Sequence, residues 1–364
     1  AYPDEIGKMD FANRRDAFCG KLGLTSVLKQ MGVKYTCFDP FVVHPSSEAF
    51  HDQLVKFQAV CRIVKKMRHL RVGAIGARTT AFKSVRFNEI ALERHGVDVE
   101  TLDLSMLLAR YRGIKASDPV VGRWREQLRE SADFGGAPEG VDIELARLGA
   151  AIDGFVRDMA LDATAIRCWS ELQLELKVAP CSVMGVFNQL GVPSVCETDA
   201  SNALAMVALA TASGGASGCL DINNNYGAEP DKCILFHCGP LPLSLMDGPG
   251  HIEEHKMFVQ TMGENCSWGV NVGRIRPGEI TLSGVRTENG EIQYYLERAE
   301  VTGDPVESAF FGTPGVMRLP GLQQKLMRMS EAGFRHHAII ARGDCTRAVR
   351  EALTKYLGYR CVEL

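Results

Sequence analysis

The sequence lacks the features that would place it among membrane-spanning or nucleic-acid-binding proteins. Its 364 residues carry a formal net charge of −3, so neither sign of charge favours nucleic acid or an anionic membrane surface as a partner. The most apolar stretch, residues 203–220, is rich in Ala, Gly, Ser and Thr, which suits a buried helix better than lipid. The sequence shows no signal-peptide pattern, and its start without Met suggests an upstream segment. We expect a cytoplasmic protein that binds neither nucleic acid nor membrane.

The sequence also lacks any C-x-x-C pair, although it contains 12 cysteines. These cysteines are spread along the chain, and several stand in apolar runs such as VPSVCETD and SGCLDI. A chain of this length can bury a core without disulfides. We therefore expect buried free thiols in a reducing compartment.

Strand and helix patterns follow one another from residue 71. Residues 71–77 (RVGAIGA) predict a strand, residues 82–96 a helix ending at Gly96, and residues 97–104 a second strand. This order is typical of a right-handed βαβ unit in a doubly wound sheet. The glycines read G-x-x-G rather than G-x-G-x-x-G, which does not favour a dinucleotide site. The basic stretch 56–71 has apolar residues at helical spacing and predicts a helix with a solvated basic face.

Carboxylates follow the next predicted strands. Residues 163–171 predict a strand ending at Glu171, and residues 192–199 predict one ending at Asp199, with a helix from Pro180 to Gly191 between them. Ligands bind at the carboxyl edge of such sheets. After about residue 230 the pattern changes to alternating strands and turns such as Glu288-Asn289-Gly290, which predicts a β-rich region closed by a helix over 345–358.

The polar residues between 166 and 240 are the main candidates for chemistry. They are Arg167, Glu171, Glu175, Glu197, Asp199, Asn202, Asp221, Asn223, Asn224, Asn225 and His237. Taken singly they have structural interpretations: Glu197 or Asp199 as a helix N-cap, the asparagines as a turn, and His237 as a core residue. Together with later histidines in apolar surroundings, they indicate a divalent metal such as Mn²⁺ or Zn²⁺.

Two histidine pairs stand apart from this region. His251 and His255 form H-x-x-E-H, the inverted zinc-peptidase pattern, which requires both histidines on one helical face. The pair follows DGPG, and a surface helix or a substrate-facing loop is the alternative. His336 and His337 precede an apolar strand, where adjacent side chains point to opposite faces, so at most one should face a given site.

At these residues the sequence resembles the L-fucose/L-arabinose isomerase superfamily, and within it the short fucose isomerase-like proteins. The similarity lies in residues 14–22, 71–89, 166–172, 178–206, 235–239 and 335–340, and CETDASNALAM (196–206) is its most specific part. The resemblance implies an α/β fold with Rossmann-like doubly wound domains followed by a β-rich α+β C-terminal domain. The expected divisions are a remnant of an N-terminal α/β domain (1–69), a second Rossmann-like domain (70–193) and the C-terminal domain (194–364).

The resemblance also implies the residues of the site and its metal. Carried over, the metal ligands are Glu171, Asp199 and His336, with His237 as a further ligand and Mn²⁺ or another divalent cation as the cofactor. Glu175 remains the alternative to Glu171, and His337 the alternative to His336. Glu171 and Asp199 would move a proton between C1 and C2 of an open-chain sugar through an enediol. The predicted sugar contacts are Glu197, Asn202, Asn224, Arg335 and His337.

The resemblance further implies a homo-oligomer, a trimer or hexamer, with sites near subunit boundaries. The expected activity is that of a metal-dependent aldose–ketose isomerase acting on a fucose-like, arabinose-like or modified sugar. Two other functions remain open at this point: a sugar-binding or inactive homologue of the same fold, and a zinc peptidase that uses His251 and His255.

Overall fold

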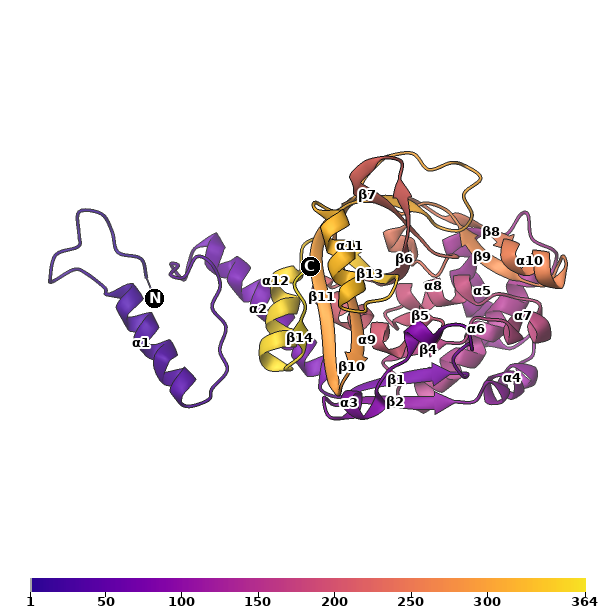
Figure 1. Ribbon diagram of the computed structural model, residues 1–364. Coiled ribbons are helices and arrows are strands. Elements are labelled where there is room, and N and C mark those ends of the chain that lie inside the picture. The colour runs from indigo at the N-terminus through magenta and orange to yellow at the C-terminus, as the bar shows by residue number, and fades with distance from the viewer. Residues whose placement is uncertain (1) are drawn as a thin grey trace.

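The computed structural model describes residues 2–364 and shows a mixed α/β protein (Figure 1). Its α-helices are α1 (Ala17–Gln30), α2 (Glu48–Met67), α3 (Glu89–Glu93), α4 (Leu104–Gly113), α5 (Pro119–Ser131), α6 (Val141–Asp158), α7 (Glu171–Leu176), α8 (Cys181–Gln189), α9 (Ala200–Ser213), α10 (Lys256–Met262), α11 (Leu322–Glu331) and α12 (Thr346–Arg350). Short helical turns of other types are η1 (Lys83–Val85), η2 (Leu243–Leu245) and the π-helical η3 (Glu351–Tyr356).

The strands form three sheets. They are β1 (Leu70–Ile75), β2 (Val97–Leu102), β3 (Ala132–Asp133), β4 (Ala163–Ile166), β5 (Ser194–Cys196), β6 (Ser217–Tyr226), β7 (Glu229–Phe236), β8 (Gly250–Glu254), β9 (Trp268–Val272), β10 (Gly278–Glu288), β11 (Glu291–Val301), β12 (Gly315–Arg318), β13 (His337–Arg342) and β14 (Arg360–Cys361).

The first sheet is parallel and has the strand order β2-β1-β4-β5. The predicted strand pair around residue 70 is confirmed, with Leu70 opposite Val97. The helix between them is shorter than predicted: α3 begins only after Asn88, whose side chain accepts a hydrogen bond from the Ala91 N–H as an N-cap. Gly96 has φ 78°, and a Cβ there would collide with the Arg68 carbonyl, so this turn requires glycine.

The second sheet is closed on itself. Its seven strands run in the order β10-β13-β6-β7-β12-β11-β14, and β10 also pairs with β11 in antiparallel register. The predicted turn between these two long strands is confirmed, with Asn289 at φ 52° and Gly290 at φ 79°. Positive φ at both central residues is the geometry of a type I′ hairpin, which follows the twist of the strands. The third sheet is small and has the order β3-β8-β9.

Helix α9 lies between the parallel sheet and the closed sheet. It contacts β1, β4 and β5 on one side and β6, β10 and β13 on the other. Nearly all of its residues are buried, and most are Ala or Ser, which allow both sheets to approach the helix closely. The expected buried helix within residues 203–220 is therefore present, although residues 217–220 belong to β6 instead. The N-terminus of α9 is where the site described below begins.

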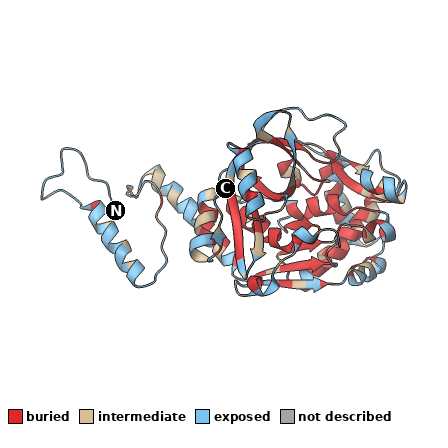
Figure 2. Ribbon diagram, viewed as in Figure 1, coloured by how far each residue is buried: buried red, intermediate tan, exposed pale blue. Residues whose placement is uncertain are grey.

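The N-terminal segment lies apart from the body of the molecule (Figure 1), and α1 is largely exposed (Figure 2). The predicted amphipathic helix over the basic stretch is confirmed as part of α2, whose Val60, Ile63 and Met67 are buried. All 12 cysteines are free thiols, and seven of them are at most intermediate in exposure within or beside the two main cores. Among residues 2–364, no helix is long and apolar enough to cross a membrane.

Candidate functional site

The turn between β5 and α9 carries the two acids of the CETD motif. Glu197 and Thr198 both adopt left-handed backbone conformations, with φ of 61° and 58°. Such conformations cost roughly 1–2 kcal/mol per non-glycine residue, and they persist where surrounding contacts impose them. One such contact is the hydrogen bond from the Thr198 N–H to the Ile166 carbonyl at the end of β4 (3.2 Å). The turn is therefore held at the carboxyl edge of the parallel sheet.

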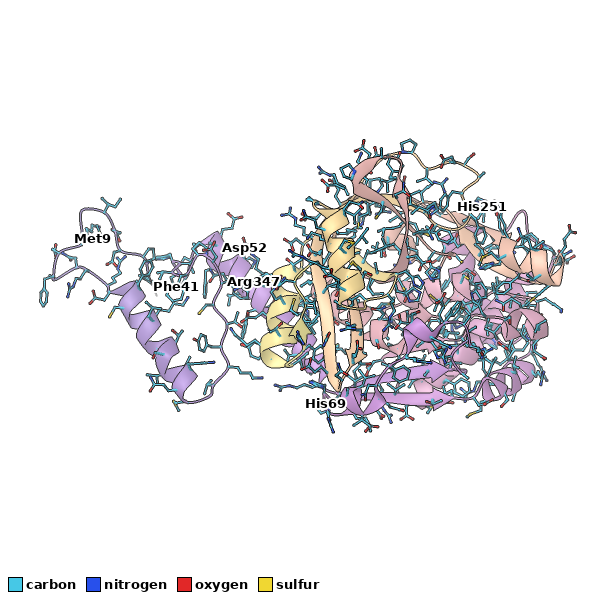
Figure 3. The ribbon with its side chains drawn as sticks, in the orientation of Figure 1. Met9, Phe41, Asp52, His69, His251 and Arg347 are labelled. Atoms are coloured by element: carbon cyan, nitrogen blue, oxygen red, sulfur yellow. The ribbon has the colours of Figure 1, made fainter. Side chains whose placement is uncertain are left out.

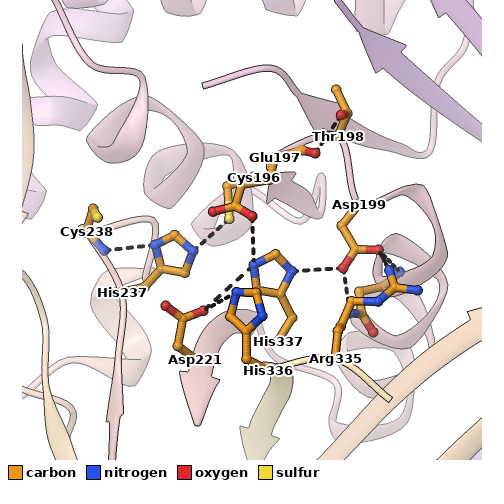
Figure 4. Close-up of polar contacts among 11 residues, drawn as sticks. Cys196, Glu197, Thr198, Asp199, Asp221, His237, Cys238, Arg335, His336 and His337 are labelled. Atoms are coloured by element: carbon orange, nitrogen blue, oxygen red, sulfur yellow. Dashed lines mark hydrogen bonds and ion pairs between the residues drawn. The ribbon is translucent and has the colours of Figure 1, made fainter. Parts of the chain in front are cut away.

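His337 lies between the two acids of this turn (Figure 4). Its Nδ1 is 2.8 Å from Oδ2 of Asp199, so Nδ1–H donates to that carboxylate. Its Nε2 lies 3.5 Å from Oε2 of Glu197 and 3.7 Å from Oδ1 of Asp221. Asp221 reaches this position because β6 and β13 pair in a register that puts it opposite His337.

Three atoms at this point are buried without a hydrogen-bond partner. They are Oε2 of Glu197, Oδ1 of Asp221 and Nε2 of His337. His336 joins them, with its Nε2 3.6 Å from Oδ1 of Asp221. Glu197, His336 and His337 each offer a ligand atom within 4.8 Å of the others. Buried charged atoms are costly unless they are paired or bound to a cation, so this donor set fits a divalent metal.

The expectation that at most one of the adjacent histidines faces the site is wrong. The rings of His336 and His337 lie 4.6 Å apart, and both approach Asp221. The reason is that β13 begins at His337. His336 precedes the strand, so the alternation of side chains along a strand does not apply to it.

Asp199 supports the site from behind. It is fully buried and is the N-cap of α9, which confirms one of the two interpretations of this residue. Its carboxylate accepts hydrogen bonds from Arg335, from His337 and from the backbone and side-chain nitrogens of Asn202. Burial alone would raise the pKa of Asp199, but the Arg335 charge and the His337 hydrogen bond outweigh it and lower the pKa. Asp199 is therefore an ionised anchor whose two oxygens are both occupied.

The electrostatics of the front of the site differ from those behind it. Burial and the charges of Asp221 and Asp199 raise the pKa of Glu197 to about 7, against the opposing effect of His337. Burial also raises the pKa of Asp221. For His337 burial favours the neutral ring, but the negative groups around it, including Asp199 and Glu197, outweigh burial and raise its pKa to about 10. The site is thus an excess of acceptors around one imidazole, as expected where a cation binds.

His237 lies beside this cluster, with its ring 5.9 Å from that of His337. Its Nδ1 accepts the Cys238 N–H at 2.8 Å, so the proton of the neutral ring is on Nε2, which donates to Sγ of Cys196 (2.8 Å). Burial lowers the pKa of His237 to about 3 and keeps the ring neutral. Both ring nitrogens therefore have partners within the chain, and the role of His237 as a metal ligand stays a prediction.

Glu171 is not the last residue of a strand, as predicted, but the first residue of α7, because β4 ends at Ile166. Its carboxylate pairs with Arg167 through two hydrogen bonds of 2.5 and 2.6 Å and accepts the Ser170 N–H. Burial raises its pKa, but Arg167 outweighs burial and lowers it. The alternative acid, Glu175, is exposed and pairs with Arg112.

The predicted sugar contacts lie in three different places. Glu197 and His337 face the cluster (Figure 4). Arg335 and Asn202 lie behind it, where Asn202 also accepts the Val285 N–H of β10 at 2.8 Å. Asn224 is exposed on β6, because the asparagine run continues the strand and does not form a turn.

The helix required for an inverted zinc-peptidase site does not form. His251 lies on strand β8, is exposed and bonds to Glu253 (Figure 3). His255 caps α10 and is buried against Trp169, Phe258 and Phe311. The two histidines thus have separate environments, and the zinc-peptidase hypothesis is wrong.

Comparison with known proteins identifies the family. Residues 1–68 match the model described as "Fucose/sulfoquinovose isomerase, N-terminal domain", and residues 235–364 match "L-fucose isomerase, C-terminal domain". The chain belongs to the fucose isomerase-like superfamily. The second of these matches includes His237, His336 and His337. The superfamily consists of sugar isomerases, and this chain is an enzyme of that class.

Three relatives carry the name sulfoquinovose isomerase. The protein of Priestia aryabhattai is 24% identical over 311 residues, which cover 85% of this chain and 68% of the relative. That of Alkalicoccus urumqiensis is 25% identical over 314 residues, with the same coverage of 85% and 68%. That of Clostridium sp. (strain MSTE9) is 23% identical over 305 residues, or 82% of this chain and 66% of the relative. In this superfamily member, Asp221 is the site residue that sequence reasoning did not select, because only the pairing of β6 with β13 brings it to His337.

Proposed function

We propose that this protein is a metal-dependent aldose–ketose isomerase that acts on the open-chain form of a sugar. The observation that carries the proposal is the convergence of three unpartnered buried atoms on Glu197, Asp221 and His337. The sulfoquinovose isomerases among its relatives make sulfoquinovose the first substrate to test, with L-fucose and D-arabinose as the family alternatives. We further propose that Mn²⁺ is the metal, that the enzyme is cytoplasmic and that it is a homo-oligomer.

The metal would be held by Glu197, Asp221, His336 and His337, where its chemistry is to polarise the carbonyl and hydroxyl oxygens of the sugar. Asp199 keeps the proton of His337 on Nδ1, so that Nε2 presents a lone pair. Arg335 keeps Asp199 ionised by pairing with it. This arrangement replaces Asp199 with Glu197 as the acid that faces the sugar, since both oxygens of Asp199 are already occupied.

Isomerisation requires one proton to leave C2 of the aldose and return to C1. A carboxylate beside the sugar can accept and return that proton, together with a second group that moves the hydroxyl proton between O1 and O2. Glu197 has one oxygen without a partner and is the residue we propose for the carbon proton. Glu171, held by Arg167 at the end of the same parallel sheet, stays the predicted partner acid.

The test is conversion of each sugar by the purified chain, followed by NMR in D₂O, where solvent deuterium marks the carbon that exchanges. We expect activity to vanish after chelation, to return with Mn²⁺, and to fall at least 100-fold in Glu197→Gln. Asp158→Asn, an exposed acid paired with Arg110, is the matched control and should keep full activity.

Activity that survives both chelation and Glu197→Gln would contradict the proposal. Binding of Mn²⁺ and of the sugar without conversion would instead support the sugar-binding homologue. Metal content measured in both variants separates loss of the cation from loss of the proton-transfer acid.

A further inference from the structure

A second set of metal-ligand atoms lies next to the acidic cluster. Cys196, Cys219, His237 and His337 are all buried, and each offers one ligand atom within 4.8 Å of the others. The four residues come from different parts of the fold: the end of β5, the interior of β6, the residue after β7 and the start of β13. Two thiols and two imidazoles are the donors that Zn²⁺ and other thiophilic cations select, whereas Mn²⁺ prefers carboxylates.

The spacing of these atoms suits a tetrahedral site. Zinc–sulfur bonds of about 2.3 Å and zinc–nitrogen bonds of about 2.0–2.1 Å place tetrahedral ligands roughly 3.3–3.8 Å apart. Separations within 4.8 Å therefore need movements of about an ångström or less, which side-chain rotation can supply. The contact between Sγ of Cys196 and Nε2 of His237 shows that these two side chains already point at each other (Figure 4).

His337 is common to both sets of donors. Its Nδ1 is committed to Asp199, so it has a single free nitrogen, Nε2, and that nitrogen can bind only one cation at a time. We propose that Cys196, Cys219, His237 and His337 form a site for a thiophilic divalent cation such as Zn²⁺ or Cd²⁺, and that its occupation withdraws His337 from Glu197 and Asp221. Binding depends only on the four residues, whereas inhibition of isomerisation rests on the proposed function of the acidic cluster.

The chemistry of binding balances without any redox step. Two Cys–S–H bonds break, two sulfur–metal bonds form, and two protons pass to the buffer. In His237 the proton moves from Nε2 to Nδ1, which exchanges the hydrogen bond from the Cys238 N–H for a bond to the metal. His337 keeps its proton on Nδ1 and binds through Nε2.

The first test is a titration of the full chain with Co²⁺, which has an intense thiolate-to-cobalt absorption in the near ultraviolet when sulfur binds it. We expect this band to saturate at one equivalent per chain and to fall at least fivefold in Cys196→Ser/Cys219→Ser. The control is Cys233→Ser, a buried cysteine of β7 that packs in the core of the closed sheet and should keep the band. Absence of the band from the wild type, or its persistence in the double variant, overturns the site.

The second test uses the wild type alone, so it does not depend on the folding of any variant. The chain is loaded with one equivalent of Mn²⁺, and free Mn²⁺ is followed by electron paramagnetic resonance as Zn²⁺ or Cd²⁺ is added. We expect release of Mn²⁺ together with two protons per cation bound. If sulfur binds Co²⁺ but added Zn²⁺ leaves Mn²⁺ in place, the sharing of His337 is refuted. Neither measurement uses sugar turnover, so failure of the proposed function would leave both outcomes readable.

Discussion

Replacing Asp199 by Asn should weaken both the fold and the metal site. Asp199 is fully buried, and the side chain of Arg335 that pairs with it is only 6% exposed. Asn keeps the size of the side chain but removes its charge, which leaves the Arg335 guanidinium buried without a counter-charge. Removing one partner of a buried pair costs about 3–5 kcal/mol. We therefore expect the free energy of unfolding to fall by about 3 kcal/mol, measured from urea denaturation.

The matched control is Asp158→Asn, because Asp158 also pairs with an arginine but its side chain is 61% exposed. An exposed pair contributes only about 0–1 kcal/mol, so this variant should unfold close to the wild type. In a double-mutant cycle, Arg335→Met combined with Asp199→Asn should cost at least 2 kcal/mol less than the sum of the two single changes. A loss in Asp199→Asn below about 0.5 kcal/mol, or additive costs, would refute this account of the pair.

The same variant has a second readout at the metal. Asn can present its carbonyl oxygen to Nδ1–H of His337, but it lacks the charge that strengthens this hydrogen bond. Loss of such a supporting interaction lowers metal affinity about 10–100-fold. We expect Mn²⁺ affinity, measured by calorimetry, to fall within this range in Asp199→Asn and to be unchanged in Asp158→Asn. Unchanged affinity in Asp199→Asn would mean that His337 does not bind the metal through Nε2.

Two further predictions concern the helices around the parallel sheet. Asp142 is buried and pairs with two arginines of α5, which lower its pKa against the effect of burial. Asp142→Asn should cost about 2 kcal/mol at neutral pH. Since the folded pKa lies below the unfolded value, this difference should persist above about pH 4 and vanish as the pH falls through the folded pKa, in urea titrations at several pH values. A Cβ at Gly149 would collide with the Trp124 ring, so Gly149→Ala should destabilise by about 1–3 kcal/mol, whereas Gly122→Ala, at an open helix position, should not. Equal midpoints for the two alanine variants would contradict this packing.

Local patterns predicted those parts of the fold that depend on neighbours in sequence. The β1–β2 pair, the basic helix within α2 and the Asn289-Gly290 turn each depend on a few consecutive residues, and the structure confirms them. Helix α3 is shorter than predicted because an asparagine cap inside the apolar pattern sets its start. The asparagine run was harder to interpret, since pairing with β7 overrides the turn preference of Asn.

The site shows the limit of the same approach. Proximity in sequence identified Asp199 and Glu197, which share one turn. It did not select Asp221, whose contribution depends on being opposite His337 in an antiparallel pair more than a hundred residues apart. Nor could it distinguish the anchoring role of Asp199 from a role facing the sugar, because that depends on Arg335 and Asn202 arriving behind it. Burial and pairing across sheets decide these roles.

The closed sheet limits how this protein can associate with other chains. Because β10 pairs with both β13 and β11, the circuit of strands has no terminal strand that a foreign peptide could extend. Where β10 runs beyond its pairing with β13, the Val285 N–H is already taken by Asn202 of α9. Edge-to-edge aggregation through this half of the molecule is therefore blocked in the folded state, and strand addition is left to the parallel and three-stranded sheets. At the edge of the parallel sheet, β2 carries Asp98 and Glu100, and such charges discourage pairing with another strand.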